Sequence, residues 1–198
     1  VICPAYTCVV VPNAIVLSGN KPVFVDCPKD SFNMSISQLE KTITKKTRAI
    51  IVTHLFGYPM DVIKVQEIVA LKEKEFGHKI YIIQDVAHSF GAKWNGELVT
   101  KFGDASFFGL NVSKILTTIF GGIVITNNKE SFEKLKEYRE ANFRLDNYKN
   151  IKKLIYAIAS NIAFRPIIYR FVNFLEDKEF INSFTKYYQE GIIDFPSD

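Results

Sequence analysis

The stretch GDASFFGLNVSKILTTIFGGIVIT, residues 103–126, decides how the rest of the chain is interpreted. Two short apolar segments, residues 105–110 and 122–126, are typical of strands, and the polar loop between them carries one lysine, Lys114. A lysine held between strands at a sheet edge is well placed for amine chemistry, because a free amine attacks carbonyl groups. The alternative is an ordinary solvated loop lysine.

A second stretch, KIYIIQDVAH at residues 79–88, combines a buried strand with two titratable side chains. The apolar run at residues 80–83 favours a parallel strand that ends near Asp85, and His88 follows three residues later. Ligands of open α/β sheets bind at the carboxyl ends of the strands. The alternatives are that Asp85 caps a helix and that His88 is a partly buried structural imidazole.

Together, a carboxylate, an imidazole and an amine suit a cofactor that has a carbonyl group and a basic ring nitrogen. Pyridoxal phosphate is such a cofactor: a lysine binds its carbonyl carbon as a Schiff base, and a carboxylate keeps its ring nitrogen protonated. The sequence therefore favours a pyridoxal-phosphate site formed by Asp85, His88 and Lys114.

The remaining pattern alternates strands and helices. Strands are expected at residues 22–26 and 49–53, and helices at 36–43 and 62–76, the latter between the caps Asp61 and Gly77. This order predicts an α/β fold with a mainly parallel sheet flanked by helices. No G-x-G-x-x-G follows a predicted strand, which argues against a dinucleotide fold.

Three local predictions complete this pattern. Thr7 is expected to cap a helix that runs to about Leu17, with Pro12 straining it beyond the first turn. Asn95-Gly96 predicts a hairpin or a polar connection. A charged amphipathic helix is expected to follow Asn127 or Asn128 and to end near Asn142.

Composition limits the classes of function. The 198 residues suffice for one domain with a sizeable core. The net charge of +4 is spread along the chain, which argues against a nucleic-acid partner. Three cysteines with no CxxC motif and no metal-like spacing from the histidines are interpreted as reduced thiols of a cytoplasmic protein without a metal site.

Several ordered motifs over residues 1–128 resemble the DegT/StrS-type sugar aminotransferases, a pyridoxal-phosphate-dependent family of fold type I. The motifs, in chain order, are PAYT at Pro4–Thr7, KPVFVD at Lys21–Asp26, HLFGYPMD at His54–Asp61, DVAH at Asp85–His88, GDASFF at Gly103–Phe108, Ser113-Lys114 and GGIVIT at Gly121–Thr126.

The resemblance implies roles for individual residues. Lys114 would form the Schiff base, Asp85 would pair with the ring nitrogen, and His88 would bond the ring hydroxyl. Cys8 stands where the family usually has an aromatic ring that stacks on the cofactor, so weaker contact is expected there. Some dehydratases of the family replace the lysine with histidine, so Lys114 favours transamination.

The resemblance also implies substrates and partners. The expected substrate is a nucleotide-linked keto-sugar, with glutamate as amino donor, in the synthesis of cell-surface glycans or related sugars. The intact protein is expected to be a homodimer. Residues 1–128 would form most of the cofactor-binding large domain, and 129–198 a helical extension that leads to a small C-terminal domain. Both ends look cut from a longer chain, so the fragment alone is expected to be inactive.

Two positions depart from the family pattern. Gly109 replaces a serine or threonine that bonds the cofactor phosphate, and Phe120 replaces a frequent acidic residue. With Cys8, these departures support a rival reading, a non-catalytic member that keeps the fold for assembly or binding. A third reading is an unrelated α/β binding protein in which Lys114 is only a loop residue.

The apolar segment at residues 151–175 is helical in pattern and broken near Pro166. Its longest uncharged run, residues 154–164, is too short to cross a bilayer, which needs about 20 residues. One interpretation is a helical hairpin packed on the domain or on a partner subunit. The other is a surface-lying helix at the inner membrane face, with basic and aromatic residues at the lipid interface. The sets are Lys152, Lys153, Arg165 and Arg170, and Tyr156, Phe164, Tyr169 and Phe174.

Overall fold

The computed structural model describes residues 1–111, 113–118, 121–143, 147–163, 165, 166, 168, 169 and 174. The chain divides into two compact units, Val1–Arg144 and Leu145–Asp198. The first unit extends past the boundary expected at residue 128, because helix α4 (Lys129–Asn142) belongs to it. This helix starts four residues after strand β8 (Gly122–Ile125) ends.

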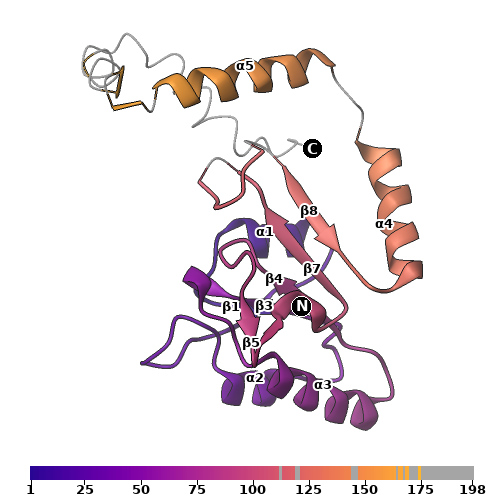
Figure 1. Ribbon diagram of the computed structural model, residues 1–198. Helices are drawn as coiled ribbons and strands as arrows, with labels where there is room; N and C mark the ends of the chain where they lie inside the picture. The colour runs from indigo at the N-terminus through magenta and orange to yellow at the C-terminus, as the bar shows by residue number, and fades with distance from the viewer. Residues whose placement is uncertain are drawn as a thin grey trace. The chain divides into compact units, whose positions relative to one another are not determined.

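A six-stranded sheet forms the centre of the first unit, in the order β2-β1-β3-β4-β7-β8 (Figure 1). The strands before β8 are β1 (Ile2–Pro4), β2 (Val23–Val25), β3 (Ala49–Thr53), β4 (Tyr81–Asp85) and β7 (Ala105–Gly109). These five strands are parallel, and only β8 runs antiparallel to its neighbour β7. The predicted α/β fold with a mainly parallel sheet is confirmed.

Helices cover both faces of the sheet. Helices α2 (Ile36–Thr42) and α3 (Val62–Phe76) pack on the face that carries Ile50 and Val52. Helix α1 (Val10–Leu17) packs on the opposite face, against Ile51. Neighbouring residues of β3 serve opposite faces because strand side chains alternate.

Side chains cap three helices, and the caps predicted for α3 and α4 are confirmed. The Ser35 hydroxyl accepts the Gln38 N–H at the start of α2, and the Asp61 carboxylate accepts the Lys64 N–H at the start of α3. Gly77 ends α3 in the left-handed conformation, at φ 71°. The side chain of Asn128, the second of the two expected candidates, caps α4.

The prediction for α1 is wrong at its start. Thr7 does not cap it; the helix begins at Val10 after Val9, whose side chain makes no capping bond. Pro12 therefore lies in the first turn, where backbone N–H groups have no partner within the helix. A proline costs little at that place, so the expected strain disappears.

Short elements complete the first unit. A two-residue hairpin joins β5 (Lys93–Trp94) to β6 (Glu97–Leu98), with Asn95 and Gly96 both at positive φ, as a type I′ turn requires. Single 3₁₀ turns occupy Leu55–Gly57 and Val99–Lys101.

The second unit contains helix α5 (Asn147–Ala163), which begins four residues before the predicted apolar segment. It ends three residues before Pro166, near the predicted break. In the described part of the chain, no helix combines the length and apolar character needed to cross a bilayer.

Candidate functional site

The carboxyl ends of the parallel strands bring the predicted site residues to one edge of the sheet. Cys8 follows β1, Asp85 ends β4 with His88 beyond it, and Lys114 follows β7. The aromatic ring of Phe56 follows β3 at the same edge. Ligands of α/β sheets bind at this edge, so the topology supports grouping these residues.

Asp85 is a buried carboxylate, 5% exposed, at the last position of β4. Its two oxygens accept the Ala87 N–H at 3.1 Å and the Thr53 hydroxyl at 3.3 Å. Thr53 is its register partner on β3. The alternative that Asp85 caps a helix is wrong, because turns and the β5–β6 hairpin follow β4.

Burial raises the pKa of Asp85 above its ordinary value, since the charged form loses hydration. The hydrogen bonds from Ala87 and Thr53, and the charges of His88 and Lys114, act in the opposite direction but are outweighed. Both basic residues therefore lie near enough to act electrostatically on this carboxylate. A further cation at this place would favour the ionised acid.

The loop of Lys114 is tied to the two strands that it connects. Gly109 pairs with Gly122, and the Leu110 N–H donates to the Gly121 carbonyl. The Leu110 carbonyl accepts the Thr118 N–H at 3.0 Å, and the Lys114 N–H donates to the Asn111 carbonyl. Lys114 is thus placed by strand pairing rather than left on a free loop.

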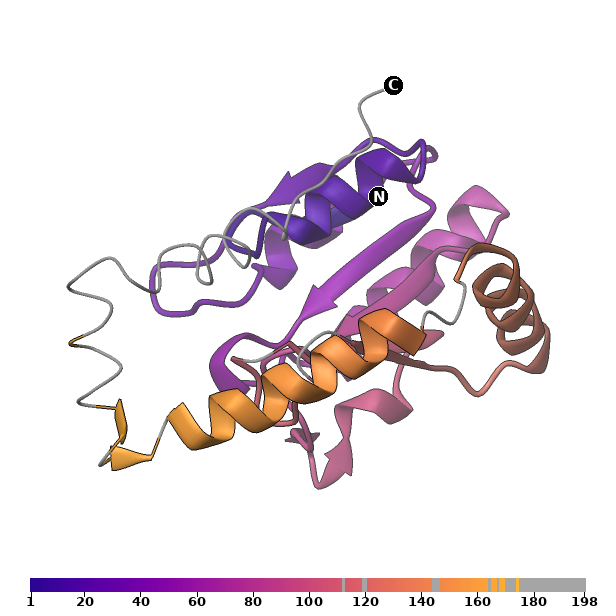
Figure 2. The same cartoon turned by 90° about the horizontal axis from the view of Figure 1, so that it is seen from above.

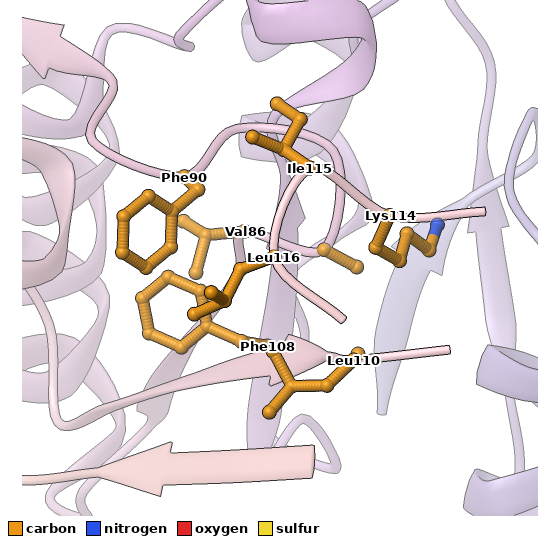
Figure 3. Close-up of a pocket in the computed structure, with 9 residues that line it drawn as sticks. Val86, Phe90, Phe108, Leu110, Lys114, Ile115 and Leu116 are labelled. Atoms are coloured by element: carbon orange, nitrogen blue, oxygen red, sulfur yellow. The ribbon is translucent and has the colours of Figure 1, made fainter. Parts of the chain in front are cut away.

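The stem of Lys114 lines a small, mainly apolar pocket together with Phe90, Phe108 and Leu116. Figure 3 shows the two aromatic rings at one end and the Lys114 amine pointing away from them. The methylene groups of Lys114 therefore line the pocket, and its amine points away from the aromatic rings.

Gly109 borders the same pocket and leaves room beside the lysine. A Cβ atom at this position would lie 3.7 Å from the Ala87 Cβ and 3.9 Å from the Lys114 Cε, both ordinary contact distances. A side chain would fit at this position, so lack of space does not explain why residue 109 carries no hydroxyl group.

His88 is half-buried, and its ring lies beside that of Phe56, with centroids 5.8 Å apart. Phe56 also contacts Phe32 at 5.3 Å and Tyr6 at 6.3 Å. Its φ of 53° is the left-handed region, which is uncommon for an aromatic residue. Such strain is frequent at functional sites.

His54 has a structural role. It is fully buried; its Nδ1 accepts the Met60 N–H, so its Nε2 donates to the Gln84 side chain. Burial lowers the pKa of His54, which keeps the ring neutral. This histidine braces the loop between β3 and α3.

Two predicted features remain untested. The Cys8 side chain is exposed in the turn before α1, and its contact with a cofactor stays a prediction. Phe120 lies outside the described residues. Among the described residues, no group of three His, Cys, Asp or Glu side chains could hold a metal ion.

Sequence reasoning missed Thr53 and Phe56. The equal lengths of the runs AIIVT and YIIQD were a usable signal for Thr53, since their last residues, Thr53 and Asp85, are register partners. Phe56 had no such signal, because nothing in HLFGYP marks a positive φ at the phenylalanine rather than only at the glycine.

A sequence model of the DegT/DnrJ/EryC1/StrS aminotransferase family matches residues 1–164. The chain belongs to this family. It is 37% identical over 139 residues to GDP-perosamine synthase of Escherichia coli O157:H7, covering 70% of this chain and 36% of the relative. It is 38% identical over 140 residues to UDP-N-acetyl-3-dehydro-alpha-D-glucosamine 3-aminotransferase of Acidithiobacillus ferrooxidans, with 70% and 36% covered.

This DegT/DnrJ/EryC1/StrS member shares its fold with solved structures of sugar aminotransferases. The PLP form of Spr1654 from Streptococcus pneumoniae matches with a TM-score of 0.61 and 30% identity, over 70% of this chain and 38% of that one. The chain spans about a third of the length of the curated relatives it matches. The fold-type-I resemblance is confirmed at the level of family and fold.

The residues present fit a cofactor that carries a ring cation and a carbonyl. Asp85 is a buried acid whose ionised form is disfavoured without a cation, and the Lys114 amine is directed away from its apolar pocket. The buried Thr7 hydroxyl, next to Cys8, has no hydrogen-bond partner among the described residues. These groups are suited to the pyridine nitrogen, the carbonyl carbon and a polar substituent, respectively.

Proposed function

We propose that the intact protein is a pyridoxal-phosphate-dependent aminotransferase that converts a keto group of a nucleotide-linked sugar to an amine. The observation that carries this proposal is a buried Asp85 that lies near enough to Lys114 to feel its charge, at the carboxyl edge of a family-typical sheet. When bound, pyridoxal phosphate supplies an electron sink that stabilises the carbanion formed at the amino-bearing carbon.

The residues of this chain have separate tasks in that reaction. Lys114 would hold the carbonyl carbon of the cofactor through Nζ, and once released its free amine would move the proton from the amino donor's Cα to the cofactor carbon. Asp85 holds the proton on the ring nitrogen through its charge. His88 would orient the ring through the neighbouring hydroxyl, and the Phe56 ring lies beside the imidazole of His88.

The substrate and the partners are inferred from the relatives. The E. coli and A. ferrooxidans relatives are named for GDP- and UDP-linked amino sugars, which supports a nucleotide-linked keto-sugar as substrate. We further propose glutamate as amino donor, a cytoplasmic homodimer, and a role in cell-surface glycan or related sugar synthesis. Residues 1–128 would form most of the cofactor-binding large domain, and residues 129–198 a helical extension.

The proposal is tested by the visible absorbance of the full-length protein with pyridoxal phosphate, before and after borohydride. We expect a band that borohydride removes, with the cofactor mass recovered on the peptide that contains Lys114. Lys114→Ala should abolish the band, whereas Lys93→Ala, at an exposed hairpin lysine, should keep it.

A folded protein without this band would refute the proposal and favour the non-catalytic reading. The observations on that side are the missing hydroxyl at Gly109 and the exposed thiol in place of an aromatic ring at Cys8. A band without amino transfer to any keto-sugar tested would leave the cofactor in place and refute only the substrate class.

A further inference from the structure

Helix α5 carries its apolar residues on one face, and this stripe is exposed. The stripe consists of residues spaced three, four and seven apart, which fall on one side of a helix. Its members are Tyr148, Ile151, Leu154, Ile155, Ile158 and Ile162, each between 45% and 67% exposed. Figure 2 shows α5 as one uninterrupted helix, so the stripe is continuous along it.

The chain around the stripe is basic and lacks acid. Residues 147–175 contain five basic residues, Lys149, Lys152, Lys153, Arg165 and Arg170, and no aspartate or glutamate. By contrast, α4 mixes Glu130, Glu133, Glu137 and Glu140 with its basic residues. An unbroken positive charge beside an apolar stripe is the pattern of helices that lie in a membrane interface.

From this combination we propose that α5 docks the protein on an anionic lipid surface, with the apolar stripe entering the acyl boundary and the lysines outside the stripe meeting the headgroups. Lys152 lies beside the stripe, where its ammonium sits 4.4 Å from the Tyr148 ring centroid. This contact holds a cation and an amphipathic aromatic side chain together at the level where headgroups begin.

The charge of α5 favours an anionic lipid surface over a second copy of this helix as the partner of the stripe. Two copies of α5 that met through their stripes would have no acidic residue within residues 147–175 to neutralise their lysines. An anionic surface neutralises all of them at once. The length argument excludes a span, since α5 has 17 residues and charges within it.

The structure changes which residues would enter the lipid. Tyr156, which the sequence interpretation places at the interface, is only partly exposed and lies about 100° or more from most of the stripe on a helical projection. The isoleucines replace it as the inserting residues. Phe164 and Arg170 lie outside the described residues.

The test is co-sedimentation of the full-length protein with phosphatidylcholine vesicles that contain 30% phosphatidylglycerol, against pure phosphatidylcholine vesicles. We expect binding only to the anionic vesicles and a decline as sodium chloride is raised. Lys152→Gln with Lys153→Gln should lower the partition coefficient roughly 10- to 30-fold, because each lysine near such a surface contributes about one kcal/mol.

The stripe has its own matched pair of variants. Ile155→Ser with Ile158→Ser should lower vesicle binding at least about tenfold, since two buried aliphatic side chains are lost. Ala157→Ser with Ala163→Ser introduces as many serines off the stripe and should bind as the wild type does. Circular dichroism checks the helix, and aminotransferase activity without vesicles should stay unchanged in all three double variants.

Three results would overturn the proposal. One is wild-type protein that stays in the supernatant with anionic vesicles. Another is a folded Ile155→Ser, Ile158→Ser protein that binds them as well as the wild type. The third is a stripe variant that lowers the oligomeric mass in light scattering while vesicle binding is absent, because the stripe would then be a contact between subunits.

Discussion

The imidazole of His88 is backed by the ring of Phe56, a residue whose own backbone is in the left-handed region. A non-glycine residue pays about 1–2 kcal/mol for this conformation. Phe56→Gly and Phe56→Ala both remove the ring, but only glycine removes the strain. We therefore expect the glycine variant to be more stable than the alanine variant by about 1 kcal/mol in thermal unfolding.

Cofactor affinity provides a second measurement on the two Phe56 variants. Both variants should bind pyridoxal phosphate several-fold more weakly than the wild type, because His88 loses its aromatic neighbour. Equal stability of the two variants would contradict the strain, and unchanged cofactor affinity would contradict the supporting role of Phe56.

Asp85 should destabilise the protein while no cation beyond His88 and Lys114 acts on it. Because burial raises its pKa in the folded state, the folded protein binds more protons than the unfolded chain between the ordinary value of 3.8 and the raised value. Its contribution to stability therefore falls as pH rises through this window. Asp85→Asn should raise the melting temperature of the cofactor-free protein at pH 7, an effect of about 1 kcal/mol.

With pyridoxal phosphate bound, the wild type should melt above Asp85→Asn. The asparagine oxygen can still accept the Ala87 N–H, and its NH2 group can donate to the Thr53 hydroxyl, but the side chain supplies no charge for a ring cation. Asp85→Asn should therefore gain less stability from pyridoxal phosphate than the wild type does. Asp30→Asn, at an exposed carboxylate, serves as the control. A variant that melts below the wild type without cofactor would show that the ionised Asp85 is already compensated.

His54 should make the protein sensitive to acid. Burial lowers its folded pKa below the ordinary 6.5, so the unfolded chain binds a proton that the folded protein does not. Stability is therefore complete above about pH 6.5 and is lost as pH falls toward the lower folded value. Urea unfolding between pH 5 and 7.5 should show this slope, and His54→Gln should flatten it.

The same variant should also lower stability at pH 7.5, by roughly 2–4 kcal/mol, since two buried hydrogen bonds are broken. A His54→Gln protein with the wild-type pH slope would assign the acid sensitivity to another group.

Gly109→Ser should strengthen cofactor binding. The position accepts a Cβ at ordinary contact distance from Ala87 and Lys114, so stability should change by less than about 0.5 kcal/mol. A hydroxyl there could bond the cofactor phosphate, and a hydrogen bond to a charged group contributes about 1.5–3 kcal/mol, or roughly tenfold or more in affinity. Gly109→Ala fills the same space without the hydroxyl; equal affinities of the two variants would exclude a phosphate bond.

The sequence predicts most of the scaffold because its signals are local. The caps Asp61 and Gly77 bound α3 as expected, and β3 begins and ends where the run AIIVT does. The prediction fails at the start of α1 because a threonine that caps a helix and a threonine in a turn look alike in the sequence. The helix starts at Val10, and this start places Pro12 in the first turn, where proline is tolerated.

The candidate site is less predictable for a physical reason. Strand order decides which strand ends are neighbours, and strand length decides that Thr53 faces Asp85. Asp85 and Lys114 could be proposed from residue type and from the family resemblance. The left-handed Phe56 and the burial that governs Asp85 depend on packing between segments far apart in the chain.

The antiparallel strand β8 has a consequence for how this site can evolve. Parallel strands need long crossovers, so a change in their connections disturbs the sheet that holds Asp85. The segment that carries Lys114 instead returns directly from β7 to β8, and the pairing of Gly109 with Gly122 closes it. Insertions or deletions there can alter the reach of the amine while the acid keeps its place. The lysine and the buried acid thus lie on separate segments of the sheet, so selection can change the position of one without rebuilding the other.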